Sequence, residues 1–171
     1  MKNEMWWTVV LAATAVLGTL ATACMMPFVA VATVAAATLR RGQAVVAVTG
    51  AWAANQLLGF GLLGYPLDGH ALGWGVALGA ASLAMVPLVA RIADGSALRL
   101  VLAFVTAFTG YELLLFGFAL VAGGRETFTS AIVAALFANE ATWFVVLAAL
   151  QVIATRGAPR LFGLAPIVRL G

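Results

Sequence analysis

The chain has 171 residues, of which 64% are hydrophobic and 9% are charged, whereas about 25% of the residues of a typical soluble domain are charged. A mean hydropathy of +1.10 excludes a compact soluble globule, because nine basic and six acidic side chains cannot cover the surface that so small a fold exposes. We therefore expect an integral membrane protein whose main partner is the lipid bilayer.

The composition also excludes several kinds of site. One cysteine and one histidine argue against a disulfide scaffold and against a Cys-rich zinc site. The basic residues are scattered as ones and twos, so they form no nucleic-acid-binding face. We therefore expect no cofactor, no bound metal and no nucleic-acid partner.

The first charge-free interval, residues 5–39, is too long for one comfortable span and short for two, since a crossing helix takes about 20 apolar residues. One reading is a single long tilted helix over about 6–39, kinked near Pro27, which gives five spans in all. A second is two short helices, which give six. In a third, residues 1–23 are a cleaved signal that ends in a small-residue site. The apolar run continues beyond that site, which favours the first two readings.

From residue 42 onward, short connections that carry the charges and are rich in Gly or Pro separate four apolar runs. The predicted spans are 43–64, 71–90, 99–123 and 128–155. Continuously apolar runs of this length are typical of membrane helices and not of barrel strands, whose side chains alternate. The predicted fold class is therefore all-α, a polytopic transmembrane bundle of five or six helices that forms a single domain over 1–171.

The positions of Lys and Arg predict the orientation in the membrane. If the connection with Arg40 and Arg41 is cytoplasmic, alternate crossings place seven of the nine basic residues on that side, as the positive-inside bias requires. We therefore expect a multi-pass protein of an inner (cytoplasmic) membrane with a cytoplasmic C-terminus.

Two acidic residues, Glu112 and Glu140, lie near the centres of the last two predicted spans. A carboxylate at the bilayer centre costs roughly 2.5–3.5 kcal/mol, so we expect both to be kept for a function: sharing a proton, or binding a cation or a solute. Residues within one helical turn of these two glutamates, and two amide side chains at the same depth in an earlier span, complete the predicted site. The predicted substrate- or ion-binding residues are Glu112, Glu140, Asn55, Gln56, Asn139, Trp143 and Thr109. The alternative is that these groups are protonated or neutral and only hold the helices together.

The connection over residues 64–70 is the most polar one on the predicted outer side. Its Pro-x-Asp-Gly run is turn chemistry, and Tyr and Trp are expected at a membrane interface. A functional interpretation makes it an outer gate, because a histidine titrates near neutral pH. The predicted gate residues are Tyr65, Asp68, His70 and Trp74. In the following span, Gly75 and Gly79 lie one turn apart and predict a close approach of helices inside the bundle.

In size and number of spans, the chain resembles the substrate-binding subunits of energy-coupling-factor vitamin transporters. The resemblance implies about six helices, a solute-binding role and a separate energising partner subunit, but no particular substrate or binding residue. The chain has no ATP-binding loop and no catalytic motif, so we expect no enzyme and no catalytic residue. The predicted function is a small membrane transport protein or the substrate-binding subunit of a transporter. The alternative is a non-catalytic membrane subunit or assembly factor whose buried polar residues are structural.

Overall fold

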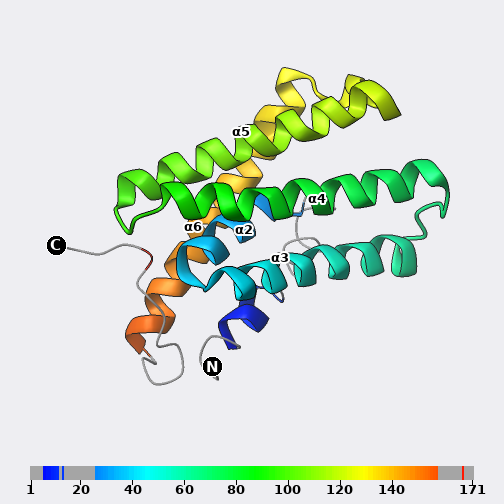
Figure 1. Ribbon diagram of the computed structural model, residues 1–171. Coiled ribbons are helices and arrows are strands. Elements are labelled where there is room, and N and C mark those ends of the chain that lie inside the picture. The colour runs from blue at the N-terminus through cyan, green and yellow to red at the C-terminus, as the bar shows by residue number, and fades with distance from the viewer. Residues whose placement is uncertain (1–5, 12, 14–25, 158–166, 168–171) are drawn as a thin grey trace.

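The computed structural model describes residues 6–11, 13, 26–157 and 167 of the chain (Figure 1). Over these residues the regular structure is entirely helical and contains no strand. The predicted all-α class is thus confirmed. Cys24 and the site of the predicted signal cleavage lie outside the described residues.

Among the described residues, four helices are long and apolar enough to cross a membrane. The first is α3 (Arg41–Gln56), which continues as the π-helix η1 (Leu57–Leu62), and the others are α4 (Gly69–Ile92), α5 (Ala97–Ala122) and α6 (Ser130–Gly157). The connections before α3 and between α4 and α5 lie at one end of the bundle, and those at 63–68 and 123–129 lie at the other (Figure 1). We call the first the arginine end, after Arg40, Arg41, Arg91 and Arg99, and the second the opposite end.

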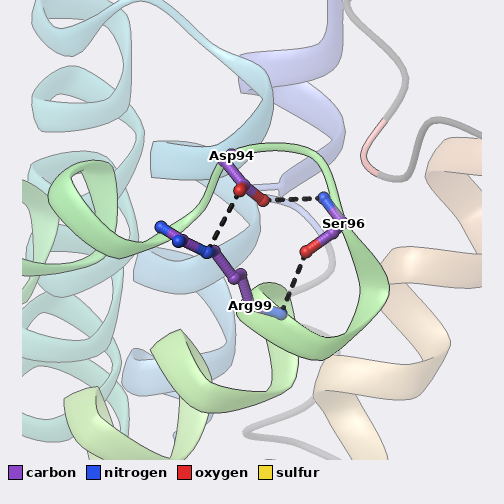
Figure 2. A network of polar contacts seen from close by, with 3 residues as sticks. All are labelled: Asp94, Ser96 and Arg99. Carbon is purple, nitrogen blue, oxygen red and sulfur yellow. Dashed lines mark hydrogen bonds and ion pairs between the residues drawn. The ribbon is translucent and has the colours of Figure 1, made fainter.

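Local sequence sets the starts of two long helices. Asp68 caps α4, because its Oδ1 accepts a hydrogen bond from the Ala71 N–H at 2.8 Å. At the start of α5 the Ser96 hydroxyl accepts from the Arg99 N–H at 3.3 Å. Asp94 joins this cap: it accepts from the Ser96 N–H at 3.0 Å and pairs with the Arg99 Nε at 3.1 Å (Figure 2).

The outward sides of the long helices expose large apolar side chains. Leu57, Leu98 and Val121 are 73%, 71% and 89% exposed. Exposure of so many large apolar side chains to water is unfavourable, whereas lipid tails match them. The four apolar helices and this surface together indicate a helical membrane protein.

The short apolar helix α2 (Phe28–Thr38) lies at the centre of the bundle. It contacts α3, α4, α5 and α6, and its residues 28–35 are all buried. Their alanines and valines are small enough for several helices to approach closely. With 11 residues, α2 is about 16 Å long, roughly half the thickness of the hydrocarbon core. Because α2 ends beside Arg40, it begins in the interior of the bundle.

The described residues do not form one straight helix over 6–39. Met26 and Pro27 are not helical, so the chain is interrupted where a kink is predicted. The Trp7 Nε1 also donates a hydrogen bond of 3.1 Å to the Thr38 Oγ1, across 31 positions, whereas one continuous helix would hold these residues about 46 Å apart. The choice between five and six spans depends on residues outside the described part and stays a prediction.

Candidate functional site

A cavity of about 270 Å³ lies beside the start of α2, and both predicted glutamates line it. All four long helices contribute to its wall, so it is a site inside the bundle. We call it the glutamate cavity. Its lining residues are Met26, Phe28, Asn55, Trp74, Leu78, Tyr111, Glu112, Leu115, Thr127, Phe128, Ile132, Leu136, Asn139 and Glu140.

Glu140 caps the N-terminus of α2. Its side chain is buried, and its two oxygens accept hydrogen bonds from the Val29 N–H at 3.1 Å and the Ala30 N–H at 2.7 Å. The first N–H groups of a helix have no partner within it, and the membrane interior offers no water to replace one. A carboxylate is the preferred group at this end of the helix dipole. The position of Glu140 in the membrane therefore has a structural explanation.

Glu112 differs from Glu140. It is half-buried on α5, and its Oε2 is buried without a hydrogen-bond partner in the described part of the chain. No hydrogen bond joins it to Glu140, whose oxygens are bound by α2. The two glutamates thus share a cavity, but a proton shared directly between them is not part of the observed arrangement.

The predicted amides lie at the boundary between two cavities. A second cavity, of about 300 Å³, extends toward the opposite end between α3 and α4, and we call it the vestibule. Asn55, Trp74 and Leu78 line both cavities, whereas Gln56 lines only the vestibule. The other vestibule residues are Gly59, Phe60, Tyr65, Pro66, Ala71 and Gly75. The vestibule therefore lies between the glutamate cavity and the polar loop at 63–68, and Asn55, Trp74 and Leu78 form the boundary between the two cavities.

The predicted gate residues surround the vestibule unequally. Tyr65 lines it and packs edge-on against Phe60, with ring centroids 6.3 Å apart. Trp74 packs edge-on against Phe118, with ring centroids 5.1 Å apart. The ring of the exposed His70 has its centroid 6.5 Å from that of Trp74. Asp68 is occupied as the cap of α4. Trp74 is thus the member of this group that reaches the glutamate cavity.

Besides Gln56, two further predicted binding residues do not line the glutamate cavity. Thr109 is exposed, donates to the Val105 carbonyl at 3.0 Å, and borders an outer groove of about 280 Å³ that it shares with Glu112. Trp143 lies one turn beyond Glu140 toward the arginine end and packs against the core. Along α6 the cavity is lined only by residues between Ile132 and Glu140. Trp143 therefore lies beyond the cavity, on the side of the arginine end.

Sequence reasoning missed the start of α2 and three ring-bearing residues of the cavity wall. Tyr111 is buried and lines the cavity, although it neighbours Glu112 in sequence and is expected to point elsewhere. Phe28 and Phe128 join it from segments far apart in the chain. No local pattern marks any of these positions, because tertiary packing brings them together.

The chemistry that the cavity offers is that of a carboxyl and amides beside aromatic rings. Among the described residues, no three His, Cys, Asp or Glu side chains cluster closely enough to hold a metal ion. Asn55, Asn139 and Thr127 supply neutral polar groups, and no Lys, Arg or His of the described segments lines the wall. The site suits a ligand that brings hydrogen-bond donors and an apolar body.

No protein-family model, curated protein or solved structure matches this chain. The fold and the site define a helical membrane protein with an acidic, aromatic-lined cavity inside its bundle. Its function has to be argued from that cavity.

Proposed function

We propose that this chain is a small membrane transport protein, or the substrate-binding membrane subunit of a transporter, and that it binds its solute in the glutamate cavity. The observation that carries the proposal is the buried Glu112 Oε2, which no group of the described chain satisfies. Insertion of a carboxylate near the bilayer centre costs roughly 2.5–3.5 kcal/mol, and among the described residues no hydrogen bond to the Glu112 Oε2 offsets that cost. A proton or a bound ligand is the interaction that remains.

The position of α2 supports the same proposal. Transporters commonly build their sites around helices that begin or break at the bilayer centre, and α2 begins at the wall of the glutamate cavity. The vestibule would then be the route by which solute reaches the site. With the arginine end in the cytoplasm of an inner membrane, that route leads from the outside. An ATP-driven cycle would need a separate energising subunit, as in the energy-coupling-factor systems that the architecture resembles.

The contacts of Glu140 support the alternative, a structural role, for that residue. Its oxygens are both used within the fold, as expected of a membrane subunit whose polar residues are structural. The two candidate functions therefore make different predictions only for Glu112. The transport function requires Glu112 to bind the solute, whereas the structural alternative does not.

A ligand screen by thermal unfolding tests the proposal. The purified full chain in detergent would be heated with members of a solute library, with intrinsic tryptophan fluorescence as the readout. A solute at one hundred times its Kd stabilises the folded state by about 2.7 kcal/mol, so a hit raises the apparent Tm. The matched variants are Glu112→Gln and Glu126→Gln, since Glu126 is exposed and does not line the cavity.

We expect at least one solute to stabilise the wild type and Glu126→Gln but not Glu112→Gln. The proposal is overturned if no solute stabilises the protein, or if every stabilisation survives in Glu112→Gln. Either result would leave the structural alternative.

A further inference from the structure

Among the described residues, no basic side chain lines the glutamate cavity to balance its acidic residues. Within the part of the chain that the structure describes, the charged side chains that line it are Glu112 and Glu140, both acidic. The two N–H groups at the start of α2 bind Glu140 at 2.7 and 3.1 Å, and the helix dipole adds about half a positive charge there. Glu112 receives no such contact. A ligand that complements this cavity therefore brings one positive charge with hydrogen-bond donors to Glu112.

From this geometry we propose that the solute is a small organic ammonium ion, whose N–H groups bind Glu112 while its apolar part lies against the aromatic wall. The proposal rests on the function proposed above and specifies its substrate class. Charge-assisted N–H···O bonds to a carboxylate are about twice as strong as neutral ones. They would satisfy the buried Glu112 Oε2 directly.

The cavity wall favours an organic cation over a metal ion. Ca²⁺ takes six to eight oxygen ligands and Mg²⁺ retains several waters, whereas most of this wall is apolar or aromatic. The rings of Trp74, Tyr111 and Phe128 instead supply surfaces that attract cations when they lie within about 6 Å. An ammonium group on a hydrocarbon body uses both the carboxyl and the rings.

The volume limits the size of the ion. At about 30 Å³ for each water-sized group, a cavity of about 270 Å³ has room for roughly nine such groups. A primary amine of that size, such as 2-phenylethylammonium, matches the cavity in volume, in charge and in aromatic character. Larger amines would have to extend past Asn55 and Trp74 into the vestibule.

Calorimetric titration of the full chain in detergent tests the substrate class with three probes of similar size: 2-phenylethylammonium, 2-phenylethanol and phenylacetate. We expect the ammonium ion to bind at least tenfold more tightly than the alcohol, and the carboxylate to bind most weakly. Glu112→Gln should lower the ammonium affinity at least tenfold, whereas Glu126→Gln should leave it unchanged. Equal affinity for the alcohol, or an unchanged ammonium affinity in Glu112→Gln, overturns the proposal.

A measurement on the wild type keeps the test independent of how Glu112→Gln folds. A water-soluble carbodiimide with a nucleophile would modify Glu112, and mass spectrometry would follow the extent. A primary amine would itself couple to the activated carboxyl, so the protecting probe is the tertiary amine N,N-dimethyl-2-phenylethylammonium, which cannot form an amide. It should slow the modification severalfold and 2-phenylethanol should not; equal rates with both probes also overturn the proposal. If the library screen instead finds a neutral or anionic solute that depends on Glu112, the ammonium class is wrong and the proposed function stands. If neither experiment finds a Glu112-dependent ligand, both fall.

Discussion

At the scale of single residues, the two membrane glutamates predict opposite effects of the same substitution. In Glu140→Gln, one amide oxygen can still accept a hydrogen bond from α2, but the NH₂ group that replaces the other oxygen faces an N–H donor. A buried donor left without its acceptor costs about 1–3 kcal/mol. We therefore expect the free energy of unfolding of Glu140→Gln to be about 1–3 kcal/mol lower than that of the wild type, with a lower Tm. Tryptophan fluorescence in detergent measures the unfolding.

Glu112→Gln should unfold at the wild-type temperature or above it. The substitution removes a carboxyl whose Oε2 has no partner in the described chain, so no internal contact is lost. Glu126→Gln, at an exposed position, is the control for the change in charge. An equal loss of stability in Glu112→Gln and Glu140→Gln would contradict the division of roles between them.

Asp94 predicts a pH-dependent contribution outside the membrane. The hydrogen bond from the Ser96 N–H lowers the pKa of Asp94 below its usual value of 3.8, and the Ser96 hydroxyl and the Arg99 charge lower it further. Because the folded-state pKa lies below the unfolded one, the stabilisation is complete above the unfolded value and is lost as the pH falls through the folded value. We expect Asp94→Asn to melt slightly below the wild type at pH 6. The difference should shrink as the pH is lowered below 3.8 toward the folded-state pKa, whereas a difference that does not change with pH would show that the charge is not involved.

At the scale of helices, the contact between α3 and α4 depends on two glycines. The Trp52 Nε1 donates to the Gly75 carbonyl at 2.7 Å, and a Cβ at Gly79 would lie 2.7–2.9 Å from the same indole ring. Gly79→Ala must therefore move the ring, and we expect it to lose about 1–3 kcal/mol of stability, as in overpacked cores. Gly117→Ala is the control: it meets no atom within 4 Å and should be neutral, or more stable by up to about 1 kcal/mol. Thermal unfolding of both variants decides, and equal melting temperatures would contradict the close packing.

The long helices are predictable because their signals are local. The predicted span 71–90 lies within the observed α4, Gly69–Ile92, since an apolar run between charges defines it. The start of α2 is different, because its partner Glu140 is 111 positions away from Val29. The inward face of α6 could not be predicted either, since a helix that is apolar on most sides carries no marked stripe. For this reason the sequence could not predict that Asn139 lines the glutamate cavity while Trp143 does not.

At the scale of the whole molecule, the two cavities lie in sequence along the bundle, with Trp74 in the wall of both. Its indole is held by Phe118 and lies against Gly124, where a Cβ would be 3.1 Å from the ring. Trp74→Ala should join the vestibule to the glutamate cavity. We expect a water-soluble carbodiimide to modify Glu112 severalfold faster in Trp74→Ala than in the wild type, and Trp74→Phe to react at nearly the wild-type rate. Equal rates in all three proteins would mean that water reaches Glu112 by another path.

The basic residues at the two ends of the bundle predict its orientation in the membrane. The described arginines gather at the arginine end, apart from Arg125, which lies beside Glu126 at the opposite end. Loops with Lys and Arg stay on the cytoplasmic side of the membrane. Alkaline phosphatase inserted at 123–129 should therefore lie outside the cell membrane and be active, whereas the same insertion at 93–96 should be inactive. Reversed activities would place the vestibule on the cytoplasmic side. The proposed direction of uptake would then be wrong, whereas binding at Glu112 would be unaffected, because it depends on the cavity and not on the side from which the cavity is reached.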